Sequence, residues 1–284
     1  TESLAALGAY LRMRSEGIEV DPVLAAELGN VVEAMGINAA SDLSAEDSAI
    51  VLGFIRAFFT QASSLLDDPG QLAGWTSTDP DLLQNQGRAS AMIAHLVSAA
   101  AATPNGIPGL RDRLAHEGSQ ICDIGTGVGW LAITFAQLFP QCHVTGIDIW
   151  EPALAIAEEN VRDSGLESRV TIAKQDASTL TSDTGFDLTF VPGPFLPRDI
   201  VPTVLNRVRA ATRAGGWAVL GLYELNATDE LARALTSIRV LRSGGYRWTT
   251  AEGESLLRTA GFSDIRTLSH TWNAPMDFVV GRAE

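Results

Sequence analysis

The pattern of hydrophobic positions changes near residue 118. Before it, apolar residues recur at helical spacing between cap and turn signals, and they predict helices near 23–35, 44–66, 80–102 and 110–116. After it, short apolar runs alternate with helical stretches. The runs predict strands near 120–124, 143–147, 170–173, 186–191, 217–222, 265–268 and 276–280. The helices predicted between them lie near 129–139, 152–164, 200–212, 229–241 and 249–260.

This alternation of strands and helices predicts an α/β fold. A sheet covered by helices on both faces is the packing that such a pattern favours. The parallel strands of such a sheet all end at one edge, and ligands bind there. We therefore expect the functional residues to follow the predicted strands.

A glycine-rich turn follows the first predicted strand. It reads Asp123-Ile124-Gly125-Thr126-Gly127-Val128-Gly129-Trp130 and opens the next predicted helix. Glycine lets the backbone turn sharply and approach a ligand closely. The helix start presents free N–H groups and a partial positive charge, which suits an anionic group. The turn therefore predicts a ligand site.

Dinucleotide-binding enzymes also use a glycine turn, and two features argue against that class. The dinucleotide fingerprint needs a small residue at its third glycine position, where this chain has Trp130. Short-chain dehydrogenases pair a tyrosine with a lysine four residues later. None of Tyr10, Tyr223 and Tyr246 has a lysine at that spacing.

The glycines at 125, 127 and 129 behind the acid at 123 resemble the first motif of class I S-adenosylmethionine (SAM)-dependent methyltransferases. The resemblance extends over residues 119–284, with Asp148 ending the second strand and Asp176 following the third. It implies an α/β fold with a Rossmann-like, doubly wound, seven-stranded sheet and an N-terminal all-helical lid. We expect a helical substrate or lid region over 1–118 and a SAM-binding domain over 119–284.

The same resemblance implies a cofactor site for SAM, with S-adenosylhomocysteine as product. A carboxylate at Asp148 can accept both ribose hydroxyls. Asp176 holds the adenine position of the family, although Asp after a strand is also ordinary turn chemistry. The expected cofactor-binding residues are Asp123, Gly125, Thr126, Gly127, Asp148, Ile149, Asp176, Ala177 and Pro192.

The segment after the fourth strand bears on the methyl acceptor. Amino-group methyltransferases often carry Asn/Asp-Pro-Pro-Tyr/Phe there, whereas this chain has Val191 at the polar position and Gly193 between two prolines. The change removes the side-chain acceptor that orients an amino group, which argues against nucleobase or glutamine methylation. The catalytic histidine that many small-molecule O-methyltransferases carry after this strand is also missing.

The candidate substrate site combines these strand ends with the helix before the core. We expect the substrate to contact Trp75, Arg88, Phe195, Tyr223 and Glu224, and His95 is the candidate catalytic residue. Each aromatic residue is equally suited to core packing, and His95 also suits a solvated helix face. Methyl transfer mainly requires alignment and exclusion of water, so no obvious catalytic pair is needed.

The amino-acid composition limits the kinds of partner that we expect this protein to bind. The chain carries 34 acidic and 20 basic residues, a formal net charge of -14, so we expect neither a nucleic acid nor an acidic membrane as partner. Cys122 and Cys142 fall in predicted core strands without metal-ligand spacing, which predicts buried reduced thiols and no metal. No signal peptide or membrane-length apolar run is evident, so we expect a cytoplasmic protein.

Three functions remain open at this stage. The first is transfer of a methyl group from SAM to a small-molecule acceptor at O, N or C, by positioning and water exclusion. The second keeps SAM but uses its sulfonium for a cyclisation or an elimination. The third is a non-catalytic SAM-binding partner of another protein. A homodimer through the helical first part is a further expectation.

Overall fold

The structure, a computed structural model, describes residues 1–37, 45–70, 74, 76–223, 230–269 and 276–284. The chain forms two compact units, one of residues 1–70 and 81–89 and one of residues 71–80 and 90–284. Helices between residues 90 and 118 belong to the second unit because Ile93 and Leu110 share a core with Ile121 of the first strand. The predicted boundary at 118 thus divides helices from strands within one compact unit.

The first unit is helical, as predicted for this part of the chain. Its helices are α1 (Glu2–Glu16), α2 (Pro22–Ala34), α3 (Ala45–Asp67) and most of α4 (Pro80–Ser90). The Asp21 carboxylate caps α2 by accepting from the N–H groups of Val23 and Leu24, and Pro22 occupies the first turn. Leu7, Leu11, Val32 and Ile55 form its core.

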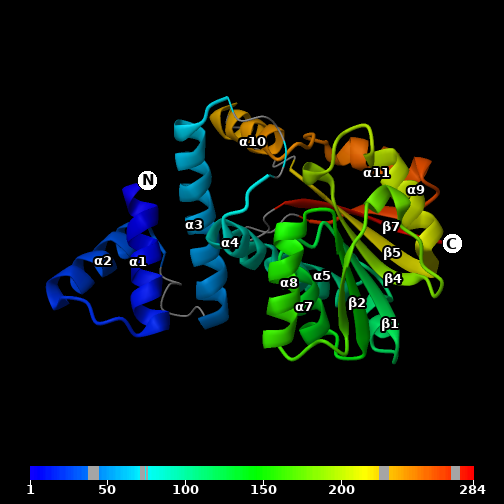
Figure 1. The fold of residues 1–284 in the computed structure, drawn as a ribbon, viewed down its shortest axis with the longest axis horizontal. Coiled ribbons are helices and arrows are strands. Elements are labelled where there is room, and N and C mark those ends of the chain that lie inside the picture. The colour runs from blue at the N-terminus through cyan, green and yellow to red at the C-terminus, as the bar shows by residue number, and fades with distance from the viewer. Residues whose placement is uncertain (38–44, 71–73, 75, 224–229, 270–275) are drawn as a thin grey trace. The chain divides into compact units, whose positions relative to one another are not determined.

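The second unit is built on a seven-stranded sheet (Figure 1). The strands are β1 (Ser119–Ile124), β2 (Cys142–Asp148), β3 (Val170–Lys174), β4 (Phe186–Pro192), β5 (Thr212–Leu222), β6 (Ser263–Thr267) and β7 (Asp277–Arg282). They lie in the order β3-β2-β1-β4-β5-β7-β6, and β7 runs antiparallel to both of its neighbours. The predicted doubly wound, seven-stranded fold is confirmed.

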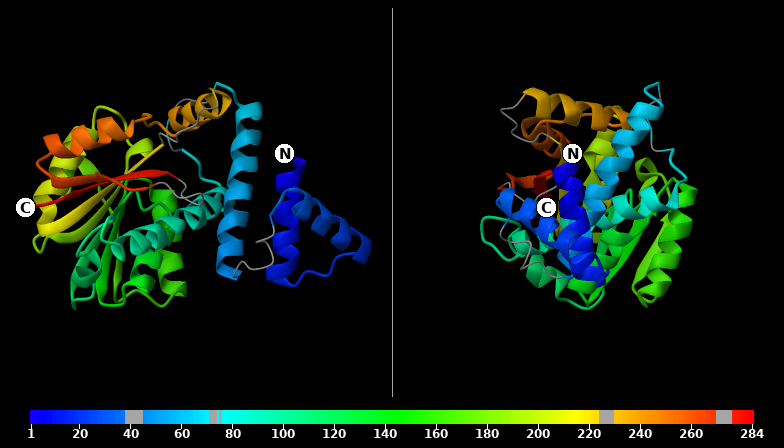
Figure 2. Two further views of the ribbon diagram at one scale, coloured as in Figure 1. Left: turned by 180° about the vertical axis from the view of Figure 1, so that it is seen from behind. Right: turned by 90° about the vertical axis from the view of Figure 1, so that its left-hand side faces the viewer.

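Helices cover both faces of this sheet. The helices of this unit are α5 (Met92–Ala101), α6 (Leu110–Leu114), α7 (Trp130–Leu138), α8 (Glu151–Asp163), α9 (Val201–Ala211), α10 (Glu230–Arg242) and α11 (Thr250–Thr259), with 3-10 turns η2 (Ala177–Thr179) and η3 (Gly193–Phe195). Strand β1 shows the alternation, because Ile121 joins the core of α5 to α7 whereas Cys122 joins that of α9 and α11. Figures 1 and 2 show α9 and α11 side by side over β4, β5 and β7.

The helix predicted over 80–102 is two helices, which corrects the sequence interpretation. Helix α4 ends at Ser90 and α5 begins at Met92. The two halves pack on different neighbours. A Cβ at Gly53 of α3 would lie 3.2 Å from the Asn85 carbonyl, so α4 fits closely on α3. Helix α5 instead packs against α7.

Both cysteines are free and buried, which confirms their predicted place in core strands. Burial raises the pKa of the Cys122 thiol well above its usual range and that of Cys142 to about 12, so both stay protonated at neutral pH. Across the described residues, no helix is both long and apolar enough to cross a membrane. The same residues contain no group of three or more metal-ligating side chains.

A buried carboxylate joins α6 to two central strands. Asp187 of β4 is 2% exposed, and its two oxygens accept from Arg113 Nη1 and Arg213 Nη1, each at 2.7 Å. It also accepts from the N–H of Gln120 at 2.8 Å. Removing one member of such a group leaves the others without a counter-charge in a partly dry environment.

We expect Asp187→Asn to lower the free energy of unfolding by about 3 kcal/mol, because two guanidinium groups lose their shared counter-ion. Urea unfolding at neutral pH measures the change. Asp163→Asn, at an exposed position at the end of α8, is the matched control and should change little. Equal stability of the two variants would show that the Asp187 ion group contributes nothing net.

Candidate functional site

The carboxyl ends of β1, β2 and β4 meet at one edge of the sheet, here called the cofactor edge. Asp123 of β1 pairs in register with Gly146 of β2, and Asp148 ends β2. Strand β4 ends at Pro192 and continues into η3. The predicted cofactor residues of these three strands therefore lie together, as expected for a parallel sheet.

The glycine turn connects β1 to α7. Gly125, Gly127 and Gly129 have φ angles of 67°, 54° and 83°, a region that side chains with a Cβ rarely adopt. A Cβ at Gly125 would lie 3.1 Å from Pro192 Cγ, and one at Gly129 would lie 3.2 Å from Ala157 Cβ. The space beside Gly127 is open. The turn is thus closed on two sides and accessible at its centre.

Asp123 and Thr126 hold the base of this turn. The Thr126 hydroxyl donates to Asp123 Oδ2 at 2.7 Å, and both residues are buried. A Cβ at Gly146 would lie 2.6 Å from Thr126 Oγ1, so only glycine leaves room for that hydroxyl. Burial raises the pKa of Asp123 to about 7; the Thr126 hydrogen bond lowers the pKa, and the nearby Asp148 raises it.

Asp148 connects two turns at the cofactor edge. Its Oδ2 accepts from the N–H of Gly127 at 2.9 Å, while Oδ1 accepts from the N–H groups of Ile149 at 2.7 Å and Trp150 at 2.9 Å. Both lone pairs of Oδ1 are thus used, whereas Oδ2 has one left. The carboxylate is therefore fixed in orientation, and its Oδ2 can still accept from a hydroxyl group.

The residues after Asp148 form an apolar wall that the sequence prediction found only in part. Ile149 was predicted, and its side chain is 65% exposed, which is unusual for a large apolar residue at a strand end. Trp150 was missed. Its indole Nε1 donates to the Ser77 carbonyl at 2.8 Å and so ties the segment before α4 to this edge. An aromatic residue two positions after the acid was the available signal.

Asp176 and Ala177 follow β3. Asp176 is the N-cap of η2, and its Oδ1 accepts from the N–H of Ser178 at 2.8 Å. This is the ordinary turn chemistry that the sequence also allowed. Ala177 is buried. Their predicted contact with adenine stays a prediction.

Phe195 and Tyr223 lie together at the ends of β4 and β5. Their ring centroids are 6.0 Å apart in an edge-to-face arrangement. Tyr223 is 8% exposed, and burial raises the pKa of its hydroxyl above the usual value. Val191, at the position where amino-group methyltransferases carry a polar residue, is fully buried within β4. This side of the edge is thus aromatic and apolar.

A second aromatic group follows α10 and is not among the predicted substrate residues. Tyr246 and Trp248 stack edge to face at 4.8 Å, and the Arg198 guanidinium lies 4.3 Å from the Tyr246 ring centroid. A Cβ at Gly245 would collide with the Pro194 carbonyl, so this segment packs directly on η3. It fixes the loop that follows β4.

The remaining predicted site residues either lie on helices before β1 or lie outside the described residues. His95 is half-buried in the first turn of α5, and α5 leads through α6 to the amino end of β1. Arg88 belongs to the first unit, and burial together with Arg56 lowers its pKa. Trp75 and Glu224 lie outside the described residues. The substrate roles of these four residues stay predictions.

The cofactor edge fits SAM in three respects. The open space at Gly127 admits close approach of a ligand to backbone. The Asp148 carboxylate is oriented to accept hydroxyls, as a ribose requires. The exposed Ile149 offers an apolar surface for a flat base.

Comparisons with known proteins agree with this geometry. Residues 121–216 match a family model described as a methyltransferase domain. The chain is 29% identical to a release factor glutamine methyltransferase of Caulobacter vibrioides, over 54% of each protein. It is 36% identical to a ribosomal protein uL3 glutamine methyltransferase of Bradyrhizobium diazoefficiens, over 32% of this chain and 28% of that one. The matches thus span about half or less of these relatives.

Solved structures resemble a larger part of the chain. The pyocyanin biosynthetic protein PhzM has a TM-score of 0.62 at 19% identity, covering 99% of this chain and 95% of that one. The mitomycin 7-O-methyltransferase MmcR has a TM-score of 0.58 at 17% identity, covering 99% and 94%. At this identity the likeness concerns the fold.

Fold and site together define a nucleotide-cofactor domain of the methyltransferase class. Residues 121–216 carry a methyltransferase domain, and the fold around them is that of solved structures that hold S-adenosylhomocysteine or SAM. This confirms the family and the cofactor inferred from the glycine turn and its acidic partners.

We expect Asp148→Asn to weaken SAM binding tenfold to a hundredfold. Hydrogen bonds to a charged group contribute roughly 1.5–3 kcal/mol, and the amide both loses charge and turns a donor toward backbone N–H groups. Calorimetry measures the affinity. Glu151→Gln is the matched control. Glu151 begins α8 shortly after Asp148, and its exposed carboxylate pairs with Lys174 at the end of β3. Unchanged affinity in Asp148→Asn would remove Asp148 from the ribose site.

The pKa of Asp123 predicts a pH effect on stability. A carboxyl whose pKa rises from 3.8 unfolded to about 7 folded keeps its proton in the native state while the unfolded chain has lost it. Its contribution to stability is therefore full below about pH 4 and declines as pH rises to 7. Relative to Asp123→Asn, the unmodified protein should lose stability between about pH 4 and pH 7. A difference in unfolding free energy that stays constant over this range would contradict the shift.

Proposed function

We propose that the protein transfers the methyl group of SAM to a small, largely apolar molecule. The observation that carries this proposal is the acceptor side of the cofactor edge, where Phe195 and Tyr223 lie edge to face and Val191 is fully buried. Such a surface suits a flat or apolar acceptor and offers no side-chain acceptor to orient an amide. The resemblance of nearly the whole chain to the fold of a small-molecule O-methyltransferase supports the same reading.

The reaction needs few chemical groups from the protein. Bound SAM supplies an electrophilic methyl on a sulfonium. An acceptor lone pair would take this methyl carbon with S-adenosylhomocysteine as the leaving group, and any acceptor proton would pass to solvent or to a base. The chain's residues align the two partners and exclude water. Phe195, next to the turn that ends β4, is placed for this alignment.

Tyr223 acts in this scheme as a protonated phenol. Its pKa is raised because burial disfavours the phenolate, so at neutral pH it can donate a hydrogen bond but cannot accept the substrate proton. His95 remains the proposed base where the acceptor holds its proton tightly. An acceptor that ionises unaided, or has no proton to lose, would need neither residue.

Glutamine methylation is the second candidate, and the sequence relatives favour it. The names of those enzymes specify a glutamine of a protein as the methyl acceptor. The sequence identity to them, 36% in one case, is higher than the 17% to the solved structure of MmcR. However, Val191 is buried and Pro192 has no polar side chain, so neither of these two positions offers a side-chain acceptor for an amide N–H. We therefore place the small-molecule acceptor first.

One assay separates the candidates. The protein is incubated with SAM and either a panel of phenols, amines and heteroaromatics or glutamine-containing peptides, and release of S-adenosylhomocysteine is measured. We expect release only with members of the first panel. Release only with peptides would overturn the proposal, and consumption of SAM without S-adenosylhomocysteine would indicate the cyclisation or elimination alternative. SAM binding without turnover on either panel would favour the non-catalytic reading.

We expect Phe195→Ala to reduce kcat/KM for that acceptor by about tenfold or more while SAM affinity changes far less, because misplacing the reacting atoms is costly. Phe195→Leu keeps most of the apolar volume and should retain more activity. Tyr223→Phe keeps the aromatic wall and should retain activity unless the hydroxyl holds the acceptor. Equal losses of SAM affinity and turnover in Phe195→Ala would place Phe195 in the cofactor site instead.

A further inference from the structure

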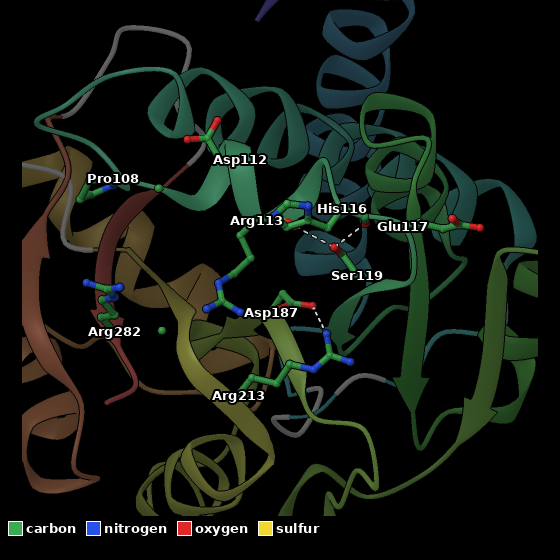
Figure 3. Close-up of a pocket in the computed structure, with 11 residues that line it drawn as sticks. Pro108, Asp112, Arg113, His116, Glu117, Ser119, Asp187, Arg213 and Arg282 are labelled. Carbon is green, nitrogen blue, oxygen red and sulfur yellow. Dashed lines mark hydrogen bonds and ion pairs between the residues drawn. The ribbon is translucent and has the colours of Figure 1, made fainter.

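A cavity of about 420 Å³ lies at the edge of the sheet opposite to the cofactor edge (Figure 3). Its walls come from the amino ends of β1, β4 and β5, the last residue of β7, and α6. No residue of the glycine turn or of the Asp148 turn lines it. The two sites therefore lie at opposite ends of the same parallel strands.

Positive charge dominates the interior of this cavity. Arg113 and Arg213 share the single carboxylate of Asp187, which is almost fully buried, so the three groups together carry one net positive charge. Arg282 is exposed and, among the residues described, its guanidinium makes no hydrogen bond or ion pair. Asp112 and Glu117 also line the cavity, but their carboxylates point away from its centre in Figure 3.

A glycine brings two of these cations close together. Gly215 has a φ of 76°, and a Cβ built on it would lie 2.5 Å from Arg113 Nη2 and 3.4 Å from Arg282 Nη2. Arg113 Nη2 also donates to the Ala214 carbonyl at 2.8 Å, which fixes its position. Like charges at such separation repel unless an anion lies between them. In a chain with a net charge of -14, this meeting of guanidinium groups is a local exception.

We propose that this cavity binds the phosphate group of a small phosphomonoester. Guanidinium groups hold phosphate oxygens in paired hydrogen bonds, and two of them facing one point suit a tetrahedral dianion. His116 at the rim adds a ring nitrogen near the same space. The volume exceeds that of a phosphate ion, which leaves room for the attached organic group. The inference does not depend on the methyl acceptor.

Calorimetry on the full chain tests the site, with inorganic phosphate and glycerol 3-phosphate as probes and glycerol as the uncharged control. We expect saturable binding of both phosphates and none of glycerol. Arg282→Gln should weaken phosphate binding at least about tenfold, as expected for loss of a charged hydrogen-bonding group. Arg162→Gln is the matched control, because it removes the same charge from an exposed position on α8. That helix packs against β3, an outer strand of the sheet that does not line the cavity.

Retained SAM affinity in Arg282→Gln would show that the variant is folded and that the two sites are separate. Binding of inorganic phosphate without glycerol 3-phosphate would overturn the phosphomonoester assignment. Equal weakening by Arg162→Gln would mean that the probes respond to net charge, not to this cavity. Absence of saturable phosphate binding to the unmodified protein would also overturn the proposal.

Discussion

The Asp148 carboxylate is the constraint on which the cofactor edge depends. It ends β2, yet it accepts from the backbone of the turn after β1 as well as from its own following residues. A charged group that satisfies three N–H groups fixes two turns that are far apart in sequence, because charge-assisted hydrogen bonds are short and strong. Without it, the N–H of Gly127 would lose the acceptor that orients the open centre of the glycine turn. The orientation of the two turns therefore depends on hydrogen bonds to one charged carboxylate.

The close packing around the turn follows from that arrangement. Thr126 can turn inward to Asp123 because Gly146 on the neighbouring strand has no side chain. Pro192 can lie against Gly125 for the same reason. Because Gly125, Gly146 and Asp148 are close neighbours, we expect the effects of substitutions at these positions on stability to be non-additive.

Much of the fold and of the cofactor edge could be predicted from the sequence, because both rest on local signals. Strand–helix alternation indicated the sheet, and the acids at 123 and 148 were found from their places after apolar runs. Tertiary partners decided the rest. The break after Ser90 follows from packing on two different neighbours, which periodicity cannot show. Trp150, Tyr246 and Trp248 acquire their roles through Ser77 and Arg198, which are distant in sequence.

The two edges of the sheet carry opposite electrostatic designs. At the cofactor edge, the Asp148 carboxylate lies beside the open centre of the glycine turn, where a cationic cofactor would bind. At the opposite edge, Asp187 is covered by guanidinium groups, and the cavity presents positive charge.

A crystal structure with S-adenosylhomocysteine tests the central claim most directly. We predict both ribose hydroxyls within hydrogen-bond distance of Asp148 and the sulfur facing Phe195. A ligand bound away from the Gly127 turn would contradict the account.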